Sequence, residues 1–133
     1  MRKKILVVDD EDDILHFLEL VLREKGYDVA TASGGHEALT KAQLEQPNLI
    51  LLDIMMPQMD GWEVLKALSR ESATAAIPVL VLTARGDEQD AARGLALGAK
   101  RYMSKPFDVR ALIAEVRRHL GLRAQEGQRR ASL

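Results

Sequence analysis

Leu49-Ile50-Leu51-Leu52-Asp53 joins four consecutive apolar residues to a carboxylate. A short, continuous apolar run is typical of a strand that is buried on both faces in the middle of a parallel sheet. The run Ile5–Val8 leads in the same way into Asp9 and Asp10. These two runs therefore predict central strands of an α/β sheet, each with acidic residues at its carboxyl end.

Strand and helix patterns alternate from one end of the chain to the other. Five strands that alternate with five helices imply right-handed crossovers and a parallel sheet covered on both faces. We expect strands at 5–8, 27–32, 49–53, 78–83 and 100–104, and helices that begin after Asp10, at Gly35, after Gly61, at Asp87 and after Asp108.

Apolar residues at helical spacing predict which side of each helix packs against the sheet. In the first helix these residues are Ile14, Phe17, Leu18, Val21 and Leu22, and in the fourth they are Ala91, Ala92, Leu95 and Ala96. Because most side chains of this stripe are small, we expect the fourth helix to be only lightly anchored.

The composition fits one globular domain. The chain has 133 residues, of which 47% are hydrophobic and 29% charged, and its net charge is −1. A nearly neutral chain does not favour broad electrostatic binding to nucleic acid or to an anionic membrane. Cysteine is absent, which excludes a disulfide framework and a thiolate metal site. We expect a domain at 1–122 and a polar, disordered tail at 123–133. Since no run is long enough for a signal peptide or a membrane span, we also expect a cytoplasmic protein.

The polar residues that follow the expected strands belong together. The carboxyl ends of parallel strands lie at one edge of the sheet, where ligands bind in such folds. Asp9, Asp10, Asp53, Thr83 and Lys105 should therefore meet there. Three carboxylates a few ångströms apart repel one another, so the pattern predicts a hard cation among them.

Four motifs occur in order at these strand ends: Val7–Glu11, Leu52–Gly61, Leu82–Ala84 and Lys105–Phe107. Together they make the chain similar to the receiver domain of bacterial two-component response regulators, over roughly residues 3–121. The resemblance implies a flavodoxin-like, doubly wound (βα)5 fold with a five-stranded parallel sheet in the order 2-1-3-4-5. It also implies a phosphorylated switch that turns over no separate substrate and so is not counted as an enzyme.

The resemblance assigns Asp53 as the phosphoryl acceptor, and a carboxylate is a competent nucleophile toward phosphorus. Asp9 and Asp10 would hold Mg²⁺, or Mn²⁺ in its place, together with Asp53 and the backbone carbonyl of Met55. Asp10 would be the direct ligand, whereas Asp9 would act through water. Met55 and Arg85 would flank the path of the hydrolysing water.

The remaining site residues would respond to the phosphoryl group. Lys105 would pair with Asp53 at rest and with a phosphoryl oxygen after transfer. Thr83 would donate its hydroxyl to the phosphoryl group, and Tyr102 would turn inward behind the moved threonine as an aromatic switch. The resemblance also implies a cis peptide bond between Lys105 and Pro106.

The resemblance implies two kinds of partner. The phosphoryl donor would be a sensor histidine kinase or a histidine phosphotransfer protein. The output would be binding of an effector protein, not DNA, by the surface of the fourth helix, fifth strand and fifth helix. Transcription-factor receivers that dimerise through this surface typically carry paired aspartates before the tyrosine, where this chain has Lys100 and Arg101. We therefore expect a monomer or a weak dimer.

Three other interpretations compete with this one. A flavodoxin-like cofactor binder would need a hydroxyl- and glycine-rich phosphate loop after the first strand, where the acidic run 9–13 would repel phosphate. A haloacid-dehalogenase-like phosphatase would need a second aspartate two residues after Asp53, where Met55 stands. A receiver used only as a phosphorylation-independent docking module would lack a site residue, and none is missing here.

Overall fold

The computed structural model describes residues 2–84 and 88–121. It contains one five-stranded parallel sheet in the order β2-β1-β3-β4-β5, which confirms the predicted fold class and strand order. The strands are β1 (Lys4–Val8), β2 (Asp28–Ala32), β3 (Leu49–Leu52), β4 (Val79–Thr83) and β5 (Arg101–Ser104). The expected tail at 123–133 lies outside the described residues, as do Arg85 and Asp87.

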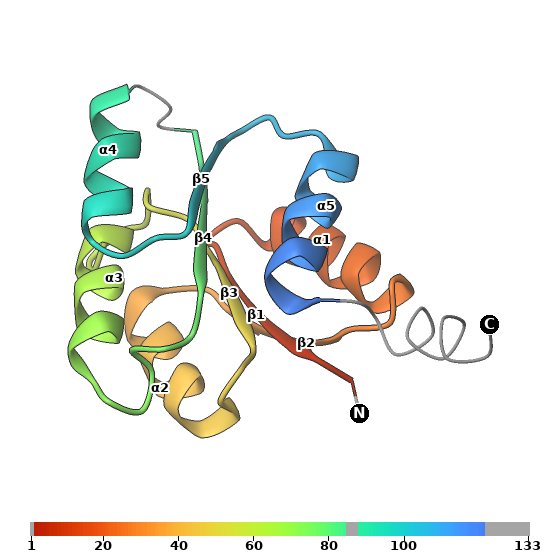
Figure 1. Ribbon diagram of the computed structural model, residues 1–133, viewed down its shortest axis with the longest axis horizontal. Coiled ribbons are helices and arrows are strands. Elements are labelled where there is room, and N and C mark those ends of the chain that lie inside the picture. Colours follow the sequence, from red (N-terminus) through yellow and green to blue (C-terminus); the bar gives the residue numbers. More distant parts are fainter. Residues whose placement is uncertain (1, 85–87, 122–133) are drawn as a thin grey trace.

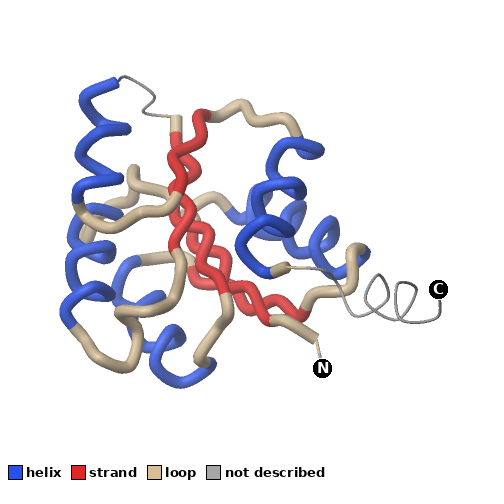
Figure 2. The backbone as a smooth tube through the Cα atoms, viewed as in Figure 1, coloured by secondary structure: helices blue, strands red, loops and turns tan. Residues whose placement is uncertain are grey.

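Helices cover both faces of the sheet (Figures 1 and 2). The helices are α1 (Asp12–Glu24), α2 (Gly35–Glu45), α3 (Gly61–Arg70), α4 (Glu88–Ala96) and α5 (Val109–Leu120). Figure 1 shows α1 and α5 on one face of the sheet and α2, α3 and α4 on the other. None of the described helices is long and apolar enough to cross a membrane.

Two-sided burial explains the apolar run that forms β3. Successive side chains of a strand point to opposite faces of the sheet. Leu49 and Leu51 pack in the core on the side of α1 and α5, while Ile50 and Leu52 pack on the side of α2 and α3. All four are at most 1% exposed. Burial of each such side chain stabilises the fold by roughly 1.5–3 kcal/mol.

The buried side of α1 differs from the prediction at one position. Leu18 and Leu22 are buried as expected, but Phe17 is 46% exposed and Leu15 is buried instead. Leu15, Leu18 and Leu22 recur at intervals of three and four residues, so they define the centre of the packed stripe. Phe17 lies at the edge of that stripe, where its ring is half covered.

The light anchoring expected for α4 is present, but the helix does not pack through the whole predicted stripe. Ala91 is half-buried, whereas Ala92, Leu95 and Ala96 are exposed, Leu95 by 53%. The helix contacts its neighbours instead through the buried Gly94, where an added Cβ atom would stand 3.2 Å from the Tyr102 ring and 3.5 Å from the Trp62 ring. A close approach of the helix backbone therefore took the place of the small apolar stripe.

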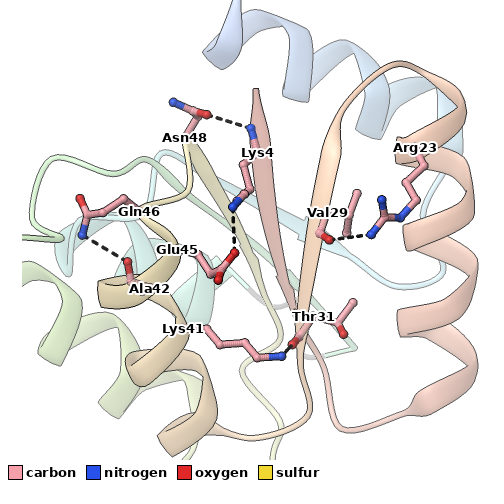
Figure 3. Close-up of polar contacts among 9 residues, drawn as sticks. All are labelled: Lys4, Arg23, Val29, Thr31, Lys41, Ala42, Glu45, Gln46 and Asn48. Atoms are coloured by element: carbon pink, nitrogen blue, oxygen red, sulfur yellow. Dashed lines mark hydrogen bonds and ion pairs between the residues drawn. The ribbon is translucent and has the colours of Figure 1, made fainter. Parts of the chain in front are cut away.

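Polar contacts tie α2 to the first strands (Figure 3). The Lys4 backbone N–H donates to Asn48 Oδ1 at 2.8 Å, and the Lys4 ammonium pairs with Glu45 at 2.8 Å. The Lys41 ammonium donates to the carbonyl oxygen of Thr31 on β2. The contacts of Glu45 and Lys41 link the helix to β1 and β2, whose carboxyl ends lead into the site described below.

The loop after β3 folds back over Asp53. The Gly61 N–H donates to the Ile54 carbonyl at 2.9 Å, and the Asp60 side chain caps α3 by accepting from the Glu63 N–H at 3.0 Å. A Cβ atom at Gly61 would stand 2.4 Å from Ile54 Cα and 2.6 Å from the carbonyl oxygen of Asp53. Only glycine fits this close approach without moving the backbone beside Asp53.

Replacing Gly61 with alanine should therefore destabilise the protein by about 1–3 kcal/mol, because the new methyl group overlaps backbone atoms. Urea unfolding monitored by circular dichroism would measure the change. Gly34→Ser is the matched control, since Gly34 has open space around its Cα and stands at a helix N-cap, where serine is favoured. Equal stability of Gly61→Ala and the parent would contradict this account of the loop.

Candidate functional site

The carboxyl ends of four neighbouring strands bring the predicted site residues together. Asp9 follows β1 and Asp53 follows β3, and these strands pair so that Val8 lies opposite Leu52. Thr83 ends β4, and Lys105 follows β5. The convergence expected from the strand-end pattern is therefore present.

Backbone hydrogen bonds hold the two aspartates in place. The Asp53 N–H donates to the Val8 carbonyl at 2.9 Å, and the Asp9 N–H donates to the Ala32 carbonyl at 3.1 Å. Asp9 is 2% exposed and Asp53 is 4% exposed. Their carboxylates are thus taken out of water, which is costly unless charges or donors compensate.

Each buried carboxylate has a donor on one oxygen and the lysine on the other. Asp9 Oδ1 accepts from the Glu11 N–H at 2.9 Å, and Asp53 Oδ1 accepts from the Met55 N–H at 3.1 Å. The Lys105 ammonium lies 2.6 Å from Asp9 Oδ2 and 3.4 Å from Asp53 Oδ2. One cation therefore serves two acidic side chains.

The expected pairing of Lys105 with Asp53 is present, and a second partner joins it. The sequence predicted Asp53 alone, whereas the shorter contact of the ammonium is with Asp9. Strand alternation could have predicted this second contact. It turns one residue of the pair Asp9 and Asp10 toward the interior, where a carboxylate needs a nearby cation. Asp9 is that residue, and Asp10 is exposed.

The environment of Lys105 favours its charged form. Burial lowers the pKa of Lys105, but the hydrogen bond to Asp9 and the charges of Asp53 and Asp9 outweigh it. The pKa of Lys105 is therefore raised above its usual 10.5. The ammonium stays protonated throughout the neutral range and compensates the buried carboxylates there.

The acidic side chains can hold a metal ion. Asp9, Asp10 and Asp53 each offer a carboxylate oxygen, and these atoms lie within 4.8 Å of one another. Such oxygen donors suit Mg²⁺, which binds one or two carboxylates and keeps several waters. The donor set thus fits the expected ion. The role of the Met55 carbonyl stays a prediction, and Arg85 lies outside the described residues.

Thr83 and Tyr102 face the same side of the sheet. Tyr102 on β5 lies opposite Val81 on β4, and Thr83 follows two residues later. Residues two apart on a strand share a face, so Thr83 and Tyr102 both point toward the α3 and α4 layer. Thr83 is fully buried, and Tyr102 packs partly buried against the core. The peptide bond between Lys105 and Pro106 is cis, as predicted.

Comparison with known families decides the classification. Residues 5–117 match the response regulator receiver domain. The chain belongs to this family. The receiver fold therefore accounts for the predicted order of strands and for the position of the acidic cluster at their carboxyl ends.

Two curated relatives of the receiver are transcriptional regulators by name. The alkaline phosphatase synthesis transcriptional regulatory protein PhoP of Bacillus subtilis is 51% identical over 117 residues, which are 88% of this chain and 48% of the relative. The probable transcriptional regulator ycf27 of Cyanophora paradoxa is 52% identical over 116 residues, or 87% of this chain and 47% of the relative. The chain thus spans about half the length of the curated relatives it matches.

Solved receiver structures resemble the whole fold. The chemotaxis protein CheY4 of Vibrio cholerae has a TM-score of 0.84 and 36% identity, covering 89% of this chain and 98% of that one. A putative response regulator from Chloroflexus aurantiacus has a TM-score of 0.85 and 35% identity, with coverage of 92% and 100%. Both similarities therefore cover about nine tenths of this chain.

Replacing Lys105 with methionine should lower the free energy of unfolding at neutral pH by roughly 1–3 kcal/mol, because two buried carboxylates lose their shared cation. Folding raises the pKa of Lys105 above its usual 10.5. The stabilisation that its charge gives to the folded protein is therefore complete below pH 10.5 and is lost as the pH rises through the higher pKa of the folded state. The stability gap between parent and variant should therefore narrow above pH 10.5.

Urea unfolding at a series of pH values would measure this gap. Lys66→Met is the matched control, since Lys66 is exposed on α3 and its loss reports general effects of alkaline pH. A gap that stays constant from neutral pH into the alkaline range would show that the ammonium charge does not stabilise this site.

Proposed function

We propose that this receiver accepts a phosphoryl group on Asp53 from a histidine kinase or a histidine phosphotransfer protein. The supporting observation is the buried Asp53 carboxylate, which lies beside Asp9 and Asp10 and within 3.4 Å of the Lys105 ammonium. This combination gives a nucleophile, a cation for negative charge and oxygen donors for a metal ion. The domain turns over no separate substrate, so its chemistry serves signalling.

Transfer makes one bond and breaks another. A carboxylate oxygen of Asp53 attacks phosphorus, and the phosphorus–nitrogen bond of the donor phosphohistidine breaks, leaving its electron pair on the imidazole. The product on this chain is an acyl phosphate. Water later attacks its phosphorus, the bond from phosphorus to the Asp53 oxygen breaks, and inorganic phosphate leaves while the carboxylate is restored, which ends the signal.

Lys105 supplies positive charge where the phosphoryl oxygens arrive. Its distance of 2.6 Å to Asp9 and 3.4 Å to Asp53 makes the Asp53 contact the easier one to give up. Asp9 would keep the ammonium in the site while the cation turns toward a phosphoryl oxygen. A positioned cation lowers the barrier most when it interacts more strongly with the transition state than with the resting state.

Asp9, Asp10 and Asp53 would hold Mg²⁺, or Mn²⁺ in its place, with the Met55 carbonyl as a further ligand. When bound, the ion neutralises oxygen charge during phosphoryl transfer. Asp10 is exposed and close to the other carboxylates, so it is the one able to bind directly without leaving an interior contact. Asp9 is already engaged by Lys105 and the Glu11 N–H.

The output would follow from Thr83 and Tyr102. Thr83 would donate its hydroxyl to the phosphoryl group, and Tyr102 would turn inward on the same face of the sheet. This change would bias the surface of α4, β5 and α5, which would then control an effector protein. In this proposal the receiver acts in the cytoplasm as a monomer or a weak dimer. The receiver itself binds no nucleic acid.

Treatment with acetyl phosphate and Mg²⁺ should raise the intact mass by one phosphoryl group, because small acyl phosphates can replace the protein donor. Asp53→Asn should abolish the rise, and chelation of divalent metal should suppress it. Intact-mass spectrometry would measure both effects. Asp60→Asn is a matched control, since Asp60 caps α3 in the same loop and should leave phosphorylation intact. A phosphorylated Asp53→Asn protein would move the acceptor elsewhere.

Asp10→Asn should weaken Mg²⁺ binding by about tenfold or more, because an amide oxygen is a poorer ligand than a carboxylate. Without metal the variant should be at least as stable as the parent, since one repelling charge is removed. Isothermal titration calorimetry and urea unfolding would give the two quantities. Asp13→Asn is the control for general charge effects near α1. Equal Mg²⁺ affinity of Asp10→Asn and the parent would exclude Asp10 as a ligand.

A further inference from the structure

The strand β2 forms one open edge of the sheet. Among the described strands it pairs only with β1, so its other edge has no strand beside it. An unpaired strand edge presents a row of N–H and C=O groups, on which a further strand can pair. The groups that β2 presents, and what covers them, therefore decide whether this edge can associate.

Val29 and Thr31 direct their backbone groups to the open edge. The Asp28 N–H donates to the Lys3 carbonyl at 2.9 Å, so Asp28 directs its backbone groups toward β1. Successive residues of a strand direct their N–H and C=O groups to alternate edges. In β2, which ends at Ala32, the residues that face outward are therefore Val29 and Thr31.

Cationic side chains already bind both outward carbonyl groups (Figure 3). The Arg23 guanidinium of α1 donates to the Val29 carbonyl at 2.9 Å. The Lys41 ammonium of α2 donates to the Thr31 carbonyl. Since α1 and α2 lie on opposite faces of the sheet (Figure 1), the edge is capped from both sides. A strand that pairs here would have to displace both side chains.

An acidic residue of the same helix holds each cation in position. Arg23 donates to Glu19 at 3.0 and 3.1 Å, and the Lys41 ammonium lies 3.4 Å from Glu37. Each acidic residue lies four positions before its cation, a spacing at which helical side chains meet. The two caps are therefore built in the same way, one on each face of the sheet.

We infer that Arg23 and Lys41 close the β2 edge against strand pairing, and that the strand they exclude is β2 of a second copy of this chain. The two side chains act as a contact built into the fold that keeps the domains separate. The inference goes beyond the proposed function, because it concerns association of folded domains and not phosphoryl transfer.

The outward groups of β2 are complementary to themselves. In an antiparallel pair, opposite residues can exchange both of their backbone hydrogen bonds. A two-fold axis at Ala30 would set Val29 of one copy opposite Thr31 of the other, so every outward N–H and C=O group of these residues would find a partner. Their β-branched side chains favour the extended conformation that such pairing needs. A second copy also brings this edge at the full concentration of the protein.

The caps make this pairing unfavourable. Pairing would break hydrogen bonds with charged donors, which are stronger than the neutral hydrogen bonds that it would form. The guanidinium and the ammonium would also lose their carbonyl partners or be enclosed between the strands, and a charge enclosed away from water is costly. Without Arg23 and Lys41, the outward carbonyl groups would be bound only by water, which a second strand can replace.

The test compares the parent protein with the double variant Arg23→Ala and Lys41→Ala by sedimentation velocity from micromolar to millimolar concentration. The double variant should dimerise at least about tenfold more tightly than the parent. Lys66→Ala with Arg70→Ala removes the same charge from exposed positions of α3 and should leave association unchanged. Circular dichroism would show whether each variant is folded. If the double variant does not fold, Lys41→Ala alone, which uncovers the Thr31 carbonyl, provides the same comparison.

A proline on the strand identifies the surface that pairs. Thr31→Pro, added to the double variant, should restore the monomer, because proline has no N–H to offer and is tolerated at an unpaired strand edge. In the dimer, the amide hydrogens of Val29 and Thr31 should exchange with solvent more slowly than in the parent, as measured by NMR. A folded double variant as monomeric as the parent, or a dimer that persists with Thr31→Pro, would overturn the inference. These measurements need no phosphoryl donor, so their outcome is independent of the proposed function.

Discussion

Two buried carboxylates that share one ammonium set the conditions for the rest of the site. Asp9 and Asp53 sit at the ends of paired strands, and Lys105 reaches both at 2.6 and 3.4 Å. Without that cation, neighbouring negative charges would be held away from water, which is costly. The arrangement requires β1 and β3 to be neighbours, with β5 on the far side of β4. The order of the sheet and the chemistry of the site therefore depend on each other.

The fold could be predicted because two-sided burial leaves a strong pattern in the sequence. The apolar run of β3 and the strand-end aspartates gave the sheet and the place of the site directly. The Lys105 contact with Asp9 was not predicted, although strand alternation indicates which of the two adjacent aspartates points inward; the length and direction of the lysine side chain, which decide its nearer partner, leave no such pattern. The packed side of α4 was mispredicted because it rests on a glycine, which carries no hydrophobic signal.

The glycine contact also explains how a change in the site could reach the surface. Thr83 and Tyr102 face one side of the sheet, and the Tyr102 ring meets α4 at Gly94. A helix whose apolar side chains are largely exposed has less packing to lose than one held by large buried side chains, and the cation–π pair of Arg93 with Trp62 is worth roughly 0.5–2 kcal/mol. In the proposed switch, a small free-energy change at Thr83 would then be enough to shift the helix between two populations.

Charge on this domain is separated in space although its net value is only −1. Asp10, Glu11, Asp12 and Asp13 are exposed around the site, whereas Arg101 and Arg118 are exposed beside β5. At physiological salt, exposed charges act over about 8 Å, so a partner responds to the local surface and not to the net charge. The acidic residues around the site and the basic residues beside β5 therefore offer a partner opposite local charges on one nearly neutral domain.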